Sequence, residues 1–184
     1  MLSEIVGEVG SDGVSAHCPL LVVQVDLSNN ELYGIGRFGG GTYNADGIKA
    51  IAQAISVTAS LTKISLAKNN LGEEGTKIIC EAMKGNTTIT ELDLSGWGHT
   101  SNIGGAPGAK CVADMLRVTA SLTSINLFAN NLGPEGARAL APAIRDSTSL
   151  TYLSTISCGL NPPNSLEDGG AIACSGLMPL RAVV

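Results

Sequence analysis

The sequence of 184 residues predicts an α/β solenoid with parallel strands on its concave face and helices on its convex face. Three observations predict this fold. A short apolar pattern recurs at a nearly constant period, a helical pattern follows each of the first four copies, and aromatic residues make up only 3% of the chain. With so few rings, the core has to be filled by aliphatic side chains stacked in regular layers.

The strand pattern sets the repeat period. Five segments fit LxxLxLxxNxL, in which the apolar residues alternate as they do along a strand. The steps between their first residues are 39, 28, 33 and 28, so the unit is 28 residues long, with eleven extra residues in the first copy and five in the third. The repeats begin at Val22, Leu61, Ile89, Leu122 and Leu150.

A glycine-led helical pattern follows each of the first four strands. GIKAIAQAI, GTKIICEAM, GAKCVADML and GARALAPAI align without gaps from Gly47, Gly75, Gly108 and Gly136. Each glycine precedes the next repeat start by 14 residues, so the extra residues lie between a strand and its helix, at one edge of the solenoid. Because the helix is the crossover between parallel strands, the coil is expected to be right-handed.

These segments resemble the 28-residue repeats of the leucine-rich-repeat proteins of the ribonuclease-inhibitor-like type. The resemblance rests on NNLGEEGTKIICEAM and NNLGPEGARALAPAI, each followed by a strand pattern, and covers roughly residues 20–178. It implies a right-handed leucine-rich-repeat solenoid, a horseshoe segment. It does not imply one activity, since the family includes inhibitors, receptors, GTPase regulators and scaffolds.

An asparagine column should close the turn after each strand. Asn30, Asn69 and Asn130 are suited to it, because an amide side chain can bond backbone groups that a curving chain leaves unpaired. In the third repeat we expect Trp97 to replace the asparagine, and in the fifth repeat Cys158.

The ends and the fourth helix depart from the pattern. Residues 22–184 would form the repeat domain and residues 1–21 a capping or frayed segment, in which Leu2, Ile5, Val6 and Val9 share one helical face. A fifth helix anchored on Gly170 would place the next repeat start at Val184. We therefore expect either a fragment of a longer array or pairing from end to end. Pro142 should bend or shorten the fourth helix.

Composition narrows the class of partner. Eleven basic and sixteen acidic residues give a net charge of −5, and no Lys/Arg cluster is present, so nucleic acid is not an expected partner. No apolar run is long enough for a signal peptide or a membrane span. The five cysteines are scattered, which indicates buried thiols in a reducing compartment, so an intracellular, cytoplasmic location is expected.

Neither a catalytic nor a cofactor site is predicted. Residues 34–39 spell GxGxxG, but they lie in the first insertion rather than at a strand end, so we interpret them as a loop in which Tyr33, Phe38 and Tyr43 pack on the scaffold. His17 and His99 have no partners at metal-ligand spacing. We therefore expect no enzyme activity, no cofactor and no metal.

The outward-facing residues of the strands form the candidate site. Two stacked rows, Gln24/Lys63/Glu91/Ser124/Tyr152 and Asp26/Ser65/Asp93/Asn126/Ser154, contain two acidic rungs, and Phe128 and Tyr152 are expected to form one aromatic patch. The insertions add loop-edge side chains. The proposed contact residues are Asp26, Lys63, Glu91, Asp93, Asn126, Phe128, Tyr152, Trp97, Arg37 and Phe38.

The column Lys49, Lys77, Lys110 and Arg138 is interpreted as the solvated outer face of the helices, with Glu81 and Asp114 as partners four residues on. The sequence thus favours a non-enzymatic module that binds an unidentified protein partner through its concave face and loop edge. Two alternatives stay open: a regulator of a small GTPase, and an element that self-associates end to end.

Overall fold

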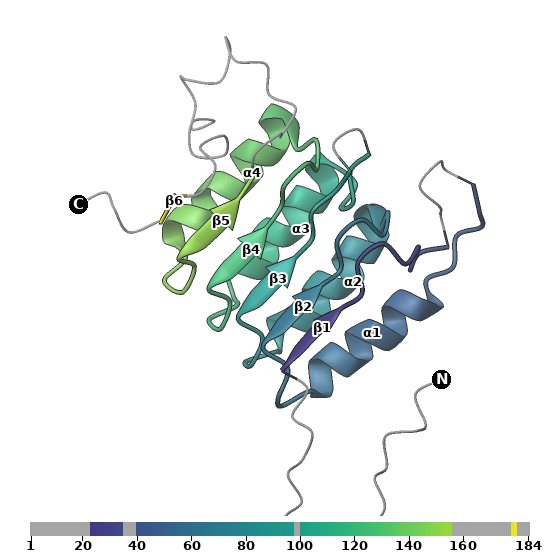
Figure 1. Ribbon diagram of the computed structural model, residues 1–184. Coiled ribbons are helices and arrows are strands. Elements are labelled where there is room, and N and C mark those ends of the chain that lie inside the picture. The colour runs from purple at the N-terminus through teal and green to yellow at the C-terminus, as the bar shows by residue number, and fades with distance from the viewer. Residues whose placement is uncertain (1–22, 35–39, 98–99, 156–177, 180–184) are drawn as a thin grey trace, which may run out of the picture.

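The computed structural model describes residues 23–34, 40–97, 100–155 and 178–179, and its elements alternate strand and helix (Figure 1). The strands are β1 Gln24–Asp26, β2 Lys63–Ser65, β3 Glu91–Asp93, β4 Ser124–Asn126, β5 Tyr152–Ser154 and β6 Met178–Pro179. The helices are α1 Asp46–Val57, α2 Gly72–Lys84, α3 Ala106–Leu116 and α4 Gly133–Asp146.

One sheet runs through the molecule in the order β1-β2-β3-β4-β5-β6, and α1 to α4 stack side by side against one of its faces (Figure 1). The pairs from β1 to β5 are all parallel and in register. Each of these strands begins two residues after its predicted repeat start, and each predicted glycine lies within the first turn of its helix. The predicted α/β solenoid with its 28-residue unit is therefore confirmed.

The core consists of aliphatic layers. In each strand from β2 to β4 the middle residue and the leucine three residues after the strand starts are buried against the helices. Completely buried members of these layers include Leu66, Leu94, Ile125 and Leu127 from the strand side and Ile79, Val112 and Met115 from the helix side. Repeated burial of the same positions explains why so few aromatic residues suffice.

The asparagine column forms a hydrogen-bonded ladder between repeats. The Oδ1 atom of Asn69 accepts a bond from the backbone N–H of Asn30 at 2.7 Å, and the Nδ2 atom of Asn69 donates to the carbonyl of Leu27 at 2.8 Å. Asn130 is equally buried, and its Nδ2 atom donates to the carbonyl of Leu94 at 2.9 Å. These bonds satisfy backbone groups where the chain turns from strand to helix.

In the third repeat the structure corrects the sequence prediction, because Asn102 and not Trp97 fills the column. Asn102 is fully buried, accepts the backbone N–H of Asn69 at 2.8 Å and donates to the carbonyl of Leu66 at 3.0 Å. Its own backbone N–H bonds to Asn130 Oδ1 at 2.8 Å. The five inserted residues of this repeat therefore precede the column position.

The first insertion packs on the scaffold through Tyr33, as expected. Tyr33 is 3% exposed, its hydroxyl donates to Glu74 Oε2 at 2.7 Å, and its ring meets that of Tyr43 edge-on at 5.0 Å. Tyr43 itself is exposed, and Phe38 lies outside the described residues. The insertion is thus anchored at its beginning, next to the start of α2.

The prediction for Pro142 is wrong as far as helix length is concerned. α4 continues through this proline to Asp146 and, with 14 residues, is the longest of the described helices. Pro142 is half-buried on a helix whose next apolar residues, Ala143 and Ile144, are buried. Packing of that turn on the core outweighs one missing helical hydrogen bond.

Several expectations fall outside the described residues. These are the capping or frayed segment 1–21, the column position Cys158 and the fifth helix anchored on Gly170. At the far end of the sheet, β6 pairs antiparallel with β5, with Leu153 opposite Met178. The strand beside β5 in the described part is thus not a further parallel repeat.

Candidate protein-binding surface on the concave face

The strand register places the predicted side chains in two rows across the sheet. From β1 to β5, each residue of a row is paired with the next residue of that row on the neighbouring strand. The first row is Gln24, Lys63, Glu91, Ser124 and Tyr152, and the second row is Asp26, Ser65, Asp93, Asn126 and Ser154. The outward-facing residues of β2 to β5 are half-buried while the middle residue of each strand is buried. Both rows are therefore on the face of the sheet that α1 to α4 do not cover.

A shallow groove of about 330 Å³ runs over this face from β1 to β4. Its polar lining comes from both rows, and the strand centres Val25, Ile64 and Leu92 complete the lining. The polar side chains that line it are those of Gln24, Asp26, Lys63, Ser65, Glu91, Asp93, Ser124 and Asn126. Grooves on protein surfaces commonly bind one extended segment or one helix of another molecule.

The acidic row is held in place by local hydrogen bonds at the ends of the strands. The Oδ1 atom of Asp26 accepts the backbone N–H of Ser28 at 2.9 Å, and that of Asp93 accepts the backbone N–H of Ser95 at 2.8 Å. The Ser28 hydroxyl also donates to Asp26 and, together with the Ser28 amide, lowers the pKa of Asp26. The carboxylate of Asp26 is therefore charged and oriented at neutral pH.

Among the described residues that line the groove, the one cation is Lys63, in the other row. Lys63 Nζ lies 2.7 Å from Glu91 Oε1 on the neighbouring strand, and both side chains are 45% exposed. An exposed pair of this kind contributes at most about 1 kcal/mol to stability. Its effect on the groove is to neutralise one carboxylate, so the negative charge that remains comes from Asp26 and Asp93.

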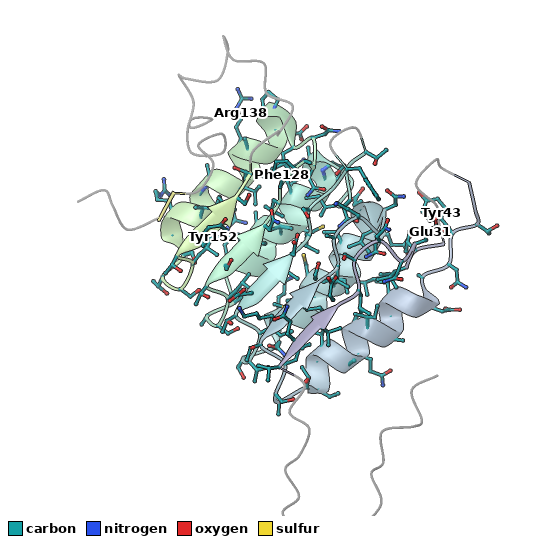
Figure 2. All side chains as sticks on the ribbon, in the orientation of Figure 1. Glu31, Tyr43, Phe128, Arg138 and Tyr152 are labelled. Carbon is teal, nitrogen blue, oxygen red and sulfur yellow. The ribbon has the colours of Figure 1, made fainter. Side chains whose placement is uncertain are left out.

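The two aromatic side chains of the predicted patch lie apart. Tyr152 is paired with Ser124, and Phe128 is four residues further along the chain than Ser124. At about 3.3 Å per residue, this separates the two positions by roughly 13 Å along the strand direction. Figure 2 shows Tyr152 and Phe128 at separate places on the molecule. The expectation of one aromatic patch is therefore wrong. Phe128, 41% exposed, stands alone beyond the end of β4.

Trp97, predicted as a loop-edge contact, is half-buried and lies beside Lys68 of the neighbouring repeat. Lys68 Nζ lies 5.0 Å from the centre of the Trp97 ring, a cation–π distance. The Trp97 backbone N–H bonds to the carbonyl of Thr100 at 3.2 Å and closes the loop. The other two loop-edge candidates, Arg37 and Phe38, lie outside the described residues.

The loop edge contains a second groove, which the sequence did not reveal. It has a volume of about 460 Å³ and lies where the first insertion meets the start of α2. Its lining combines Tyr33 and Tyr43 with Gly72, Glu73, Glu74 and Lys77. The signal was the pair of glutamates in the first helical turn, but nothing in the spacing indicated that Tyr33 would reach Glu74.

The helical column behaves as an outer face. Lys49, Lys77, Lys110 and Arg138 are all exposed. Lys110 Nζ pairs with Glu135 Oε1 of the next repeat at 2.6 Å. The expected pairs four residues apart are replaced by pairs three residues apart, namely Glu81 with Lys84 and Asp114 with Arg117.

The described part of the chain contains no metal-ligand cluster. Within it, no group of three or more His, Cys, Asp or Glu side chains could hold a metal ion. Burial raises the pKa of the Cys80 thiol, and it also raises the pKa of Cys111, which is less completely buried. Neither thiol is therefore an activated nucleophile. None of the helices in these segments is both long and apolar enough to cross a membrane.

Comparisons with known proteins agree with the repeat geometry. The family model described as Leucine Rich repeat matches residues 120–141. The Cep78 homolog of Drosophila melanogaster is 37% identical over 71 residues, which are 39% of this chain and 8% of that protein. The chain thus spans less than a tenth of this curated relative.

Two solved structures share the fold. Actin-binding site 2 of leiomodin-1 matches with a TM-score of 0.57 at 17% identity and covers 71% of this chain and 68% of that chain. The tropomodulin C-terminal domain of Caenorhabditis elegans matches with a TM-score of 0.54 at 17% identity, covering 72% of each chain. The repeat register, the asparagine ladder and these likenesses together show a leucine-rich-repeat fold of the ribonuclease-inhibitor-like type.

Proposed function

We propose that this protein is a non-enzymatic protein-binding module whose concave groove takes a basic segment of its partner. The observation that carries the proposal is the charge of the groove. Lys63 is paired with Glu91, which leaves Asp26 and Asp93 as two oriented carboxylates in one row. Complementary charge across an interface directs encounter and excludes wrong partners.

The spacing of the two carboxylates specifies the partner more closely. Asp26 and Asp93 lie in the same row, two strands apart, which is roughly 10 Å at about 4.8 Å per strand. Two Lys or Arg residues three apart in a polyproline II segment lie on one side of it, about 9 Å apart. Two such residues seven apart in a helix also share one side and lie about 10.5 Å apart. We therefore expect basic residues at one of these two spacings.

Phe128 supplies an apolar contact at the end of this groove. It is 41% exposed and lies two residues beyond Asn126, whose Oδ1 atom accepts the Phe128 backbone N–H at 3.0 Å. Aromatic side chains that are accessible on a polar surface are frequent energetic anchors of interfaces. A partner with an apolar residue next to its basic pair would use both features. Tyr152, at the other end of the strands, would be a separate contact.

The test uses designed peptides and charge reversal in the groove. Proline-rich peptides of polyproline II conformation, with two Arg residues at spacings of two, three and four, are titrated against the full chain by fluorescence anisotropy, and so are the same peptides with Glu. The Arg peptide of spacing three should bind tightest, and Asp26→Lys with Asp93→Lys should weaken it by about tenfold or more. The matched control reverses two exposed convex charges, Lys49→Glu and Arg138→Glu.

Two results would contradict the proposal. Equal affinity for Arg and Glu peptides would mean that the charge of the groove does not determine what it binds. Loss of binding in the convex control, with affinity retained in the groove variant, would move the surface to the helices. Phe128→Ala should change stability by only about 0.5 kcal/mol, since the side chain is exposed, and should weaken capture of a natural partner.

Actin is a second candidate partner, because the solved structure that covers 71% of this chain is named for an actin-binding site. Co-sedimentation of the full chain with actin filaments, compared with Asp26→Lys and Phe128→Ala variants, tests this directly. Regulation of a small GTPase stays an untested prediction. End-to-end association through β5 would have to displace β6, which is paired with Tyr152 and Leu153.

A further inference from the structure

The N-terminal end of the solenoid carries an apolar groove of about 370 Å³. It lies on the first repeat, between α1 and the first two strands. Only Thr58 contributes a polar side chain to its lining. The rest of the lining comes from Val25, Leu27, Ile51, Ala54, Ile55, Val57, Leu61 and Ile64. Of these residues, Val25 and Ile64 also line the polar concave groove.

The lining residues occupy positions that belong to the core in every later repeat. Ile51 is half-buried, whereas its equivalents in the next three helices are at most 1% exposed: Ile79, Val112 and Leu140. Val25 is half-buried as well, whereas the central residues of the next four strands are at most 5% exposed: Ile64, Leu92, Ile125 and Leu153. The first repeat therefore has the side chains of an interior repeat.

An interior repeat needs a neighbour on both sides. The outer face of a terminal repeat in a solenoid is normally polar, because otherwise its core side chains meet water. Here Ala54 and Val57 are exposed, and Val57 is 77% exposed although it is a large apolar residue. An apolar surface of this kind on a repeat end is expected to be covered.

We propose that the chain's own residues 1–22 cover this groove, with Leu2, Ile5, Val6 and Val9 as the contacts. Their spacing of three, one and three residues places these four side chains on one face of a helix. Glu4 and Glu8 fall on the other face. The segment thus has an apolar side that matches the groove and a charged side for water.

Chain connectivity favours this occupant over a separate molecule. The segment joins the described structure at Val23, beside β1, which among the described strands is paired only with β2. The 14 residues from Val9 to Val23 span up to roughly 46 Å at about 3.3 Å each, whereas α1, with 12 residues, is about 18 Å long. A tether of this length also gives the segment an effective concentration of about millimolar.

Hydrogen exchange of the full chain, read by mass spectrometry on peptides from residues 1–9, tests the proposal. The perturbing variant is Ala54→Arg, which places a long charged side chain in the groove at an exposed helical position. The matched control is Gln53→Arg, equally exposed on α1 but outside the groove. Exchange within residues 46–57 shows whether α1 remains folded.

In the natural chain and in Gln53→Arg, amides of residues 2–9 should exchange about tenfold or more slower than in a free peptide of the same sequence. In Ala54→Arg they should exchange at the free-peptide rate. Replacing Leu2, Ile5, Val6 and Val9 by Ser should give the same result, whereas Glu4→Ser with Glu8→Ser should not.

Free-peptide rates in the natural chain would overturn the proposal, as would protection that survives Ala54→Arg. Protection that disappears on dilution would assign the groove to a second copy of the chain and would equally overturn it. Because peptide binding to the concave groove is measured separately, failure here leaves the proposed function untouched.

Discussion

The asparagine ladder can be tested at Asn102, the position that the structure adds to it. Asn102→Ala removes the acceptor of the Asn69 N–H at 2.8 Å and the donor to the Leu66 carbonyl at 3.0 Å. The Leu94 carbonyl, which also accepts from Asn102, keeps its bond from Asn130 at 2.9 Å. The Leu71 N–H, 3.4 Å from the same Oδ1 atom, loses its acceptor as well. Two buried N–H groups and one buried carbonyl are thus left without these partners.

Each buried backbone group left unpaired costs about 1–3 kcal/mol, so the free energy of unfolding should fall by about 3 kcal/mol. For a domain with a total stability of roughly 5–15 kcal/mol, this is a large fraction. In urea, with a slope of about 2 kcal/mol per molar, the midpoint should fall by roughly 1.5 M without a change in slope.

The control is Asn30→Ala, at the end of the same ladder. Asn30 is exposed, and its side chain donates to the Ser28 carbonyl at 3.1 Å. Its loss should change the stability by about 0.5 kcal/mol or less. If Asn102→Ala and Asn30→Ala had the same small effect, the ladder would not carry the energy assigned to it. Asn102 would then fill the column in the third repeat without stabilising the fold.

Two further outcomes follow from individual side chains. Gly108→Ala should lower the free energy of unfolding by more than about 3 kcal/mol, because a Cβ at this position would collide with the Ile103 carbonyl. Thermal unfolding followed by circular dichroism measures this loss. The control is Gly85→Ala, in open space at the end of α2, which should leave stability unchanged or raise it slightly. Burial and Glu74 raise the pKa of Tyr33 to about 12, above its ordinary 10.0. Its contribution to stability is therefore fully present below about pH 10 and is lost as the pH rises toward 12. In Tyr33→Phe the melting temperature should fall less between pH 10 and pH 12 than it does in the natural chain. The same fall in both proteins would contradict the role given to the Tyr33 hydroxyl.

The repeat architecture was predictable because its signal occurs several times in the sequence. Five strand patterns and four helical patterns share one register, and each observed strand from β1 to β5 begins two residues after its predicted start. A chance match in one copy would not recur at the same spacing in the others. Burial follows the same periodicity, since a core position in one repeat is a core position in the next.

The position of Asn102 was missed because an insertion can be placed on either side of a column. Counting forward three residues from Leu94 assigns Trp97 to the column. Counting back six residues from the helix glycine gives a different answer: it leads from Gly75 to Asn69, and from Gly108 to Asn102. The first repeat has its insertion after Asn30, so the two insertions differ in place. Buried backbone groups decide between the alignments, because a tryptophan cannot accept the hydrogen bonds that the turn requires.

The surface posed a different problem, because no repetition constrains it. Alternation correctly placed Phe128 and Tyr152 on outward-facing positions, but being on one face does not fix the distance along the strand. The register itself contained the answer: Tyr152 is equivalent to Ser124, and Phe128 lies four residues beyond Ser124. Contacts such as the one from Tyr33 to Glu74 occur once, between an insertion and a helix start, and have no second copy to reveal them. In a repeat protein the features that distinguish one molecule from another are those that break the repeat, so specificity depends on the part of the sequence where pattern reasoning has least support.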